Sequence, residues 1–491
     1  MSGVKSVILI TVDCLRADHT GFMGYARPTT PFLDELASES IVVPKAIVTG
    51  APTYYSFPGI MASRFPLALG RDVVGVAPGE PTLATVLQQA GYRTAAFVAG
   101  NPYLSMRFGY GQGFEIFQDF LSTELPGSGE MPGGDSKARF LTRFNRKLAE
   151  AAHRAGSLGG LYDELYFQYR QRIAAPKTSW DRLRRFPAAD VLVDQACDWL
   201  KTVGQQPFFL WLHFMDPHAP YYPRAEALAA MGVANDADRG RYLNAAWLEL
   251  SEKRVRKYRE EVVDLYDAGI CWIDRQISRM VEMLRTLSQW DSSVFALTAD
   301  HGEELLDHGG RFHYSSRVFQ ELLHVPLLLR VPGMNTKALS DAPFSHLHLA
   351  PTLLDAVGME APAEFEGRSA LGVEAAQWAI SESIGRCTNP MEADKRMFGR
   401  VLAVQDRRYK LVVDFDGKSE QLFDLENDPR ELRPLAANTE KASRAGLLRL
   451  AAQHLARSAK GANRERALRA RVREVGLEWK HSKMKSRTLA T

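Results

Sequence analysis

Short apolar runs alternate with amphipathic helical runs along most of the chain, and this alternation strongly constrains the fold. The runs lie at Ser6–Val12, Thr94–Val98, Phe208–His213, Ser293–Thr298 and Val325–Leu329. The segments with helical spacing of apolar residues lie at Thr30–Ser38, Thr82–Ala90, Val191–Val203 and Tyr258–Leu284. Strands that alternate with helices predict an α/β fold, in which a mainly parallel central sheet is flanked by helices.

The chain has 491 residues. Single hydrophobic cores seldom extend beyond roughly 250–300 residues, so more than one domain is expected. We expect a main α/β domain at 1–375 with an insertion at about 120–190, where the alternation breaks. A small antiparallel α+β subdomain is expected at 376–437. Its strand candidates are Arg400–Asp406, Arg408–Phe415 and Gln421–Leu425, with a turn at Asp416-Gly417.

Residues 438–491 form a basic tail. From Lys441 to Thr491 there are fourteen Lys or Arg and three Glu, a net charge of +11; because the whole chain carries +3, the remainder carries −8. Leu447, Leu448, Leu450, Ala451 and Leu455 recur at helical spacing, which predicts a helix packed on the body, followed by a loose arm. A solvated basic helix is the favoured interpretation. Contact with an anionic surface or partner is the alternative, and we find no specific nucleic-acid motif.

The cysteines and the apolar runs bear on the cellular compartment. Cys14, Cys197, Cys271 and Cys387 are scattered without paired spacing, which is typical of reduced thiols. The run Ser6–Val12 is too short for a signal peptide, and no apolar stretch approaches the ~20 residues that span a bilayer. These features predict a soluble cytoplasmic protein.

Acidic and imidazole side chains follow two of the predicted strands. Asp13 ends the first strand, and Asp300-His301 follow the strand at Ser293–Thr298. Ligands bind outside the carboxyl ends of the strands in an open α/β sheet, and carboxylates with a neutral imidazole are competent ligands for a divalent cation. A single Asp at a strand end is more often a helix cap or a turn residue.

Several motifs resemble those of sulfatase-family enzymes of the alkaline phosphatase superfamily, and they run in family order from about residue 6 to 430. They are Val7–His19, Gly24-Tyr25, Thr30–Asp34, His213–Tyr221, Tyr266–Arg275, Thr298–Glu304, His308-Gly309, His313, Glu321–Pro326, His348–Asp355, Gly367–Ser369 and Leu422–Pro429. The resemblance implies an alkaline-phosphatase-like fold and a metal-dependent hydrolase of sulfate, phosphate or phosphonate esters.

The chain departs from the family at the nucleophile. Typical sulfatases carry a Cys or Ser in a Cys/Ser-x-Pro-x-Arg motif that is oxidised to formylglycine. Anchored on Arg64-Phe-Pro66, the matching position is Thr53, and the motif's Arg is replaced by Phe57. We therefore expect no formylglycine and a direct attack by Thr53 that gives a covalent Thr ester. In the alternative, Thr53 is a turn residue and Ser56 caps a helix at Ser56–Ser63.

The resemblance also implies a metal site formed by Asp13, Thr53, Asp300 and His301. Cys14 replaces the second N-terminal Asp of calcium-type sulfatases. The loss of one hard carboxylate favours Mn²⁺, Zn²⁺ or Mg²⁺ over Ca²⁺, without resolving which ion binds.

Five further residues have predicted roles at the site. By the resemblance, His218 contacts the ester oxygens or the leaving group, and an imidazole with an unperturbed pKa near ~6.5 could protonate a departing alkoxide. His313 would bind the anion, with a solvent-exposed loop histidine as the alternative. Asn101 and His213 are the substrate-binding candidates, and His308 is a weaker one. His213 could instead support a metal ligand.

The leading hypothesis is a hydrolase that acts on an anionic ester through a covalent Thr53 intermediate. One alternative is a phosphoryl- or substituted-phosphoryl transferase, or phosphodiesterase, on the same site. A non-catalytic binding protein with a sulfatase fold is the other. The oligomeric state is left open.

Overall fold

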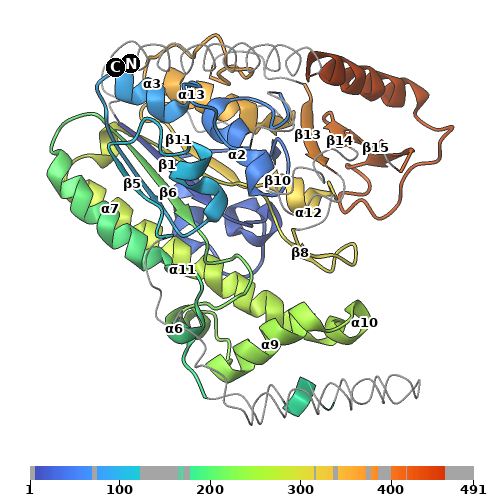
Figure 1. The fold of residues 1–491 in the computed structure, drawn as a ribbon, viewed down its shortest axis with the longest axis horizontal. Coiled ribbons are helices and arrows are strands. Elements are labelled where there is room, and N and C mark those ends of the chain that lie inside the picture. Colours follow the sequence, from blue (N-terminus) through green and yellow to red (C-terminus); the bar gives the residue numbers. More distant parts are fainter. Residues whose placement is uncertain are drawn as a thin grey trace, which may run out of the picture.

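The computed structural model describes residues 6–68, 74–121, 165, 167–169, 177–313, 317–334, 341–371, 377–384, 400–415 and 417–458. A seven-stranded sheet with the order β2-β11-β7-β1-β6-β4-β5 forms its centre (Figure 1). The strands are β1 (Ser6–Val12), β2 (Ile41–Val42), β4 (Arg93–Val98), β5 (Ile116–Gln118), β6 (Phe208–Phe214), β7 (Ser293–Ala299) and β11 (Leu327–Arg330). Strands β7, β1, β6, β4 and β5 run parallel, and β11 is antiparallel to both β7 and β2. The predicted mainly parallel sheet is confirmed.

The predicted strand Val325–Leu329 is two strands. His324–Val325 form β10, which pairs with β3 (Ala46–Ile47) in a separate sheet that includes β12 (Phe344–Ser345), whereas Leu327 begins β11. Pro326 lies at the break, and proline has no N–H to donate to a continuous ladder.

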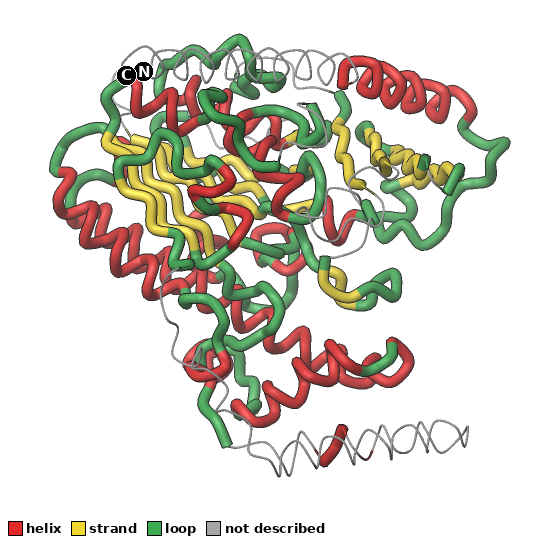
Figure 2. The backbone as a smooth tube through the Cα atoms, in the orientation of Figure 1, coloured by secondary structure: helices red, strands yellow, loops and turns green. Residues whose placement is uncertain are grey.

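Helices cover both faces of the central sheet. Helices α7 (Ala189–Val203) and α11 (Arg259–Thr286) lie on one side, and α2 (Thr53–Ala62), α3 (Leu83–Gln89) and α13 (Leu349–Ala356) lie on the other (Figures 1 and 2). The predicted stripe on α11 is buried: Val262, Tyr266, Ile270, Ile273, Ile277 and Met280. The shorter helices are α1 (Pro31–Ala37), α6 (Trp180–Leu183), α8 (Ala225–Ala230), α9 (Ala237–Glu249), α10 (Glu252–Val255) and α12 (Gln320–Leu323).

A four-stranded antiparallel sheet follows the main body. Its strands are β13 (Ala379–Ile384), β14 (Arg400–Gln405), β15 (Tyr409–Asp414) and β16 (Ser419–Asp424). The predicted meander corresponds to β14–β16, and β13 is an additional strand. Helical residues 441–458 place Leu447 and Ala451 in the same apolar cluster as Leu402 and Leu411, as their spacing predicted.

Parts of three predictions lie outside the described residues. They concern most of the insertion at about 120–190, the arm beyond residue 458, and Cys387. The other three cysteines are free and buried. Among the described helices, none combines the length and apolar character needed to cross a bilayer.

Candidate active site

Several polar side chains meet at the carboxyl edge of the central sheet, because parallel strands bring their carboxyl ends to one edge. Asp13 follows β1, Asn101 follows β4, and Asp300 and His301 follow β7, while His213 lies near the end of β6. All five are buried. Side chains far apart in sequence therefore share one polar site under the loops.

Thr53 faces this site from the first residue of α2. Its Oγ1 lies 3.5 Å from Oδ2 of Asp13 and 3.3 Å from Nε2 of His301. The helix begins at Thr53 and not at Ser56 as predicted. Ser56 lies inside the helix and donates to the Thr53 carbonyl at 3.1 Å, so the alternative in which Ser56 caps the helix is wrong.

The two predicted substrate-binding residues both contact Asp13. Nδ2 of Asn101 donates to Oδ2 of Asp13 at 2.8 Å, and Nε2 of His213 lies 3.5 Å from the same oxygen. Nδ1 of His213 lies 2.9 Å from the hydroxyl of Thr11, which also accepts from Nε1 of Trp211 at 2.9 Å. The contacts at Nδ1 fix the ring of His213 so that its Nε2 faces the carboxylate of Asp13.

His301 is oriented toward the two carboxylates. Its Nδ1 donates to the carbonyl of Gly302 at 2.8 Å, and its Nε2 lies 3.6 Å from Oδ1 of Asp13 and 3.6 Å from Oδ2 of Asp300. A Cβ on Gly302 would lie 1.9 Å from the carbonyl oxygen of Glu321, so only glycine fits in this loop. Because Nδ1 of His301 carries the donated proton, the lone pair on Nε2 points into the site.

This donor set fits a divalent cation. Among the described residues, Oδ2 of Asp300 and Nε2 of His213 have no hydrogen-bond partner although both are buried. Buried polar atoms normally have partners, and a bound cation would supply one to the carboxylate. Ligand atoms of Asp13, His213 and Asp300 all lie within 4.8 Å of one another, and so do those of Asp13, Cys14 and His301. Together with the hydroxyl of Thr53, 3.3 Å from His301, these are the groups that could hold the ion.

The carboxylates differ in their pKa values. Burial, reinforced by the charge of Asp13, raises the pKa of Asp300 to about 6. Burial also opposes ionisation of Asp13, but His218, His213 and His301 outweigh it and hold its pKa well below the usual range. Two neighbouring carboxylates thus share a site in which Asp13 ionises more readily than Asp300.

The turn after Asp13 is strained and firmly held. Cys14 has a φ of 64°, which is uncommon for a residue other than glycine. Tyr266 donates to the Cys14 carbonyl at 2.6 Å and accepts from the Arg16 amide at 3.0 Å. Burial, with Glu303 and Asp13 nearby, raises the pKa of the Cys14 thiol well above its usual value.

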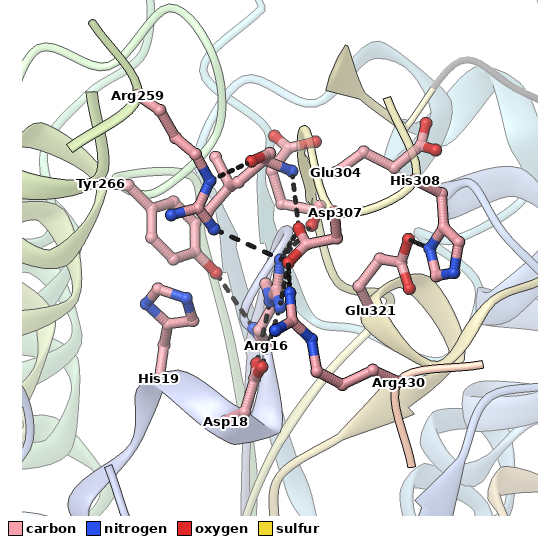
Figure 3. A network of polar contacts seen from close by, with 12 residues as sticks. Arg16, Asp18, His19, Arg259, Tyr266, Glu304, Asp307, His308, Glu321 and Arg430 are labelled. Atoms are coloured by element: carbon pink, nitrogen blue, oxygen red, sulfur yellow. Dashed lines mark hydrogen bonds and ion pairs between the residues drawn. The ribbon is translucent and has the colours of Figure 1, made fainter. Parts of the chain in front are cut away.

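Arg16 connects this turn to the loop after β7 (Figure 3). Its guanidinium pairs with Asp18 at 2.8 Å and with Asp307 at 2.6 Å, and it donates to the Glu303 carbonyl at 3.1 Å. Charge-assisted hydrogen bonds of this kind are the stronger ones in proteins. Arg16 therefore holds the segment after Asp13 against the segment after Asp300.

Two more histidines border the site. His313 is 5% exposed, so the alternative of a solvent-exposed loop histidine is wrong. Its ring lies 4.6 Å from that of His301 and 4.9 Å from that of His218. His308 instead pairs with Glu321 at 2.6 Å (Figure 3). Its ring stacks on that of Phe319 with the centroids 3.7 Å apart.

Glu303 is a site residue that sequence reasoning did not single out. It is fully buried, accepts from the Tyr221 hydroxyl at 3.1 Å, and lies 3.4 Å from Nδ1 of His313. Burial raises its pKa to about 7. Its place two residues after His301 in the quoted motif was the available signal.

Phe57 lies beneath the site. Its ring is 5.2 Å from that of His213 and 5.6 Å from that of Trp211. The guanidinium of Arg64, which follows α2, pairs with the carboxylate of Glu80. The floor of the site below His213 is therefore apolar.

Comparisons with known proteins agree with this architecture. The sequence profile described as Sulfatase matches residues 5–359, and that described as N-sulphoglucosamine sulphohydrolase, C-terminal, matches residues 309–455. The chain is 24% identical to the multifunctional alkaline phosphatase superfamily protein PehA of Trinickia caryophylli, over 88% of this chain and 91% of that protein. It is also 24% identical to an arylsulfatase of Clostridium perfringens, over 90% and 92%.

A solved structure shares the fold. The phosphonate monoester hydrolase of Silicibacter pomeroyi superposes with a TM-score of 0.63 at 20% identity, covering 93% of this chain and 96% of that one. The profile match extends over more than half of the chain and includes the strands that carry Asp13, His213 and Asp300. The chain therefore belongs to the sulfatase family of ester hydrolases.

Proposed function

We propose that the chain is a metal-dependent hydrolase of sulfate or phosphonate esters that acts through a covalent intermediate on Thr53. The observation that carries the proposal is the position of the Thr53 hydroxyl, 3.3 Å from His301 and 3.5 Å from Asp13. A threonine in a structural turn has no need of two buried ionisable groups at its hydroxyl. A bound divalent cation would lower the pKa of that hydroxyl.

In the proposed first step, Oγ1 of Thr53 attacks sulfur or phosphorus and its proton passes to Oδ2 of Asp13, 3.5 Å away. A new O–S or O–P bond forms on Thr53, and the bond to the leaving oxygen breaks. Thr53 is the first residue of α2, whose ten residues direct free amides and a partial positive charge toward an anionic group at this end. Water then hydrolyses the Thr53 ester and restores the hydroxyl.

Three contacts would position the reacting groups. Asn101 holds Oδ2 of Asp13 at 2.8 Å and lies 3.5 Å from Oγ1 of Thr53, so it orients both. Nδ1 of His218 contacts the carbonyl of Ala219, which leaves Nε2 for the leaving oxygen. We expect the loss of Asn101 to impair the geometry of attack and not only the affinity for substrate.

Sulfate and phosphonate esters are both retained as substrate classes. The relatives and structural neighbours carry the names arylsulfatase, choline-sulfatase and phosphonate monoester hydrolase. Both groups present a tetrahedral anion of similar shape. A screen of aryl sulfates, phosphonate monoesters and phosphate diesters with purified protein would separate them.

Thr53→Ala tests the mechanism. We expect it to abolish turnover, since a fall of 10³-fold or more is of the order seen when a covalent nucleophile is lost. Thr53→Ser keeps the hydroxyl and should retain activity. Ser56→Ala, one helical turn away, is the matched control and should turn over normally, because its hydroxyl only contacts the Thr53 carbonyl.

Trapping the covalent intermediate tests the role of Thr53 directly. Acid quenching during turnover and peptide mapping should place a sulfo or phosphono group on Thr53, and intact mass should show no aldehyde at Thr53 or Cys14. Normal turnover by Thr53→Ala, or a label on Ser56, would overturn the assignment.

A further inference from the structure

A buried glutamate of the C-terminal sheet contacts the chain on both sides of α2. Glu382 lies in β13 and is 0% exposed. Its Oε1 accepts from the amide of Leu67, which follows the end of α2, at 2.9 Å. Its own backbone amide donates to the carbonyl of Thr49, which precedes α2, at 2.9 Å. One residue of the C-terminal sheet therefore connects the two segments that flank the helix beginning at Thr53.

The segment before α2 is in close contact with both Glu382 and the helix. A Cβ on Gly50 would lie 2.2 Å from the carbonyl oxygen of Glu382, so the two backbones touch where glycine stands. Oγ1 of Thr49 donates to the carbonyl of Tyr55, in the first turn of α2, at 3.0 Å. A shift of Glu382 would therefore move the segment that sets the position of Thr53.

The second carboxylate oxygen of Glu382 has two partners of its own. Oε2 accepts from Nε of Arg400 at 3.0 Å and lies 3.0 Å from Nε2 of His454. His454 belongs to the helical residues 441–458, is 2% exposed, and has its ring 4.3 Å from that of Phe65. Burial opposes ionisation of Glu382, but Arg400 and His454 outweigh it and lower its pKa to about 2. The buried carboxylate is therefore charged at neutral pH, with hydrogen bonds at both oxygens.

We propose that Glu382 is a positioning residue for Thr53: Arg400 and His454 fix its carboxylate, and Glu382 braces both ends of α2. Charge-assisted hydrogen bonds inside a protein are stronger than neutral ones, so this carboxylate has little freedom to shift. The inference rests on the proposed function, because it concerns the placement of the attacking hydroxyl. A misplacement of about 1 Å can slow such a reaction by about 10²-fold. Through His454, the C-terminal helical residues then contribute to turnover.

A second ion pair of the same helical residues provides a matched control. Nη1 of Arg444 lies 2.7 Å from Oε1 of Glu420 in β16. Among the described residues, neither forms a hydrogen bond with the segments that flank α2. Both pairs dock residues 441–458 on the C-terminal sheet, but only the contacts of Glu382 reach α2. Variants of the two glutamates therefore separate positioning of Thr53 from docking alone.

Steady-state kinetics of the full-length protein test the proposal on an ester that wild type turns over. Glu382→Gln should lower kcat by about 10–100-fold and change KM by less than about threefold, since the geometry of attack is impaired and the substrate contacts remain. Glu420→Gln should keep both constants. His454→Leu should also lower kcat, whereas His454→Gln keeps a side-chain N–H donor for Oε2 of Glu382 and should recover most of the loss.

Hydrogen exchange of the same proteins without substrate gives a readout that does not depend on turnover. The amides of α2, Thr53–Ala62, should exchange several-fold faster in Glu382→Gln than in wild type, because the helix has lost a brace at each end. Glu420→Gln should match wild type in this helix. The difference should persist when Thr53→Ala is added to Glu382→Gln, since the Thr53 hydroxyl is not part of the brace.

The outcomes distinguish this inference from the proposed function. Unchanged kcat in Glu382→Gln, unchanged exchange of α2, or equal losses of kcat in Glu382→Gln and Glu420→Gln would each exclude a positioning role. Normal turnover by Thr53→Ala, with faster exchange of α2 in Glu382→Gln, would instead contradict only the covalent mechanism and leave the brace in place.

Discussion

Asp300 combines a buried carboxylate, a neighbouring negative charge and an oxygen that has no partner among the described residues. Such a group destabilises the protein unless a cation is bound. We expect Asp300→Asn to lose most of the bound Mn²⁺, because one anionic ligand is removed from a site built on an independently packed sheet. Elemental mass spectrometry of protein dialysed against Mn²⁺ measures this.

The thermal midpoint of Asp300→Asn in the metal-free state should stay at or above that of wild type, since a buried charge beside Asp13 has gone. Asp291→Asn is the matched control: it precedes the same strand, is 99% exposed, and should keep its full Mn²⁺ content. Full Mn²⁺ content in Asp300→Asn would exclude Asp300 as a ligand.

At the scale of elements, Asp274 of α11 holds the start of α1. Its carboxylate accepts from the amides of Phe32 at 3.0 Å and Leu33 at 2.9 Å, and burial raises its pKa to about 7. A folded pKa above the unfolded value favours the protonated folded form. The contribution of Asp274 to the free energy of unfolding therefore falls as pH rises from about 4 to 7.

We expect Asp274→Asn to gain stability relative to wild type between pH 5 and pH 8, on the order of 2 kcal/mol, because the variant has no charge to bury. Denaturant unfolding at both pH values measures the difference between variant and wild type. Asp198→Asn, on the exposed face of α7, should show no such change. An unchanged difference for Asp274→Asn would mean that its two amide contacts fully stabilise the ionised form.

At the scale of the whole molecule, a buried ion pair within the C-terminal part of the chain contacts the main body. Nζ of Lys410 in β15 lies 2.7 Å from Oε1 of Glu431, and both side chains are 0% exposed. The other oxygen of Glu431 accepts from the amide of Gln320 at 2.6 Å, at the start of α12. Through this amide contact, Glu431 links the C-terminal part of the chain to α12 of the main body.

Lys410→Met should lower the free energy of unfolding by about 3–5 kcal/mol, because it leaves Glu431 as an unpaired buried charge. Adding Glu431→Gln should recover part of the loss. Lys201→Met, which breaks an exposed pair with Asp198, should cost less than about 1 kcal/mol. Equal effects of Lys410→Met and Lys201→Met on the denaturation midpoint would show that the buried pair does not stabilise the docking.

Much of the fold was predictable because it depends on local patterns. The buried strands β1, β6 and β7 are continuous apolar runs, as strands covered on both faces must be, and α11 carries its apolar stripe at helical spacing. Asp13 and Asp300 could be placed at one edge from sequence alone, since parallel strands end on the same side of a sheet.

Other features were decided only by tertiary structure. The start of α2 at Thr53 brings its hydroxyl to His301, and the sequence around Ser56 carried a competing cap signal. Cys14 and His313 are 299 positions apart and meet only because β1 and β7 are neighbours in the sheet. Sequence periodicity specifies which face of an element is buried, but the distances between residues on different elements follow from how the whole chain packs.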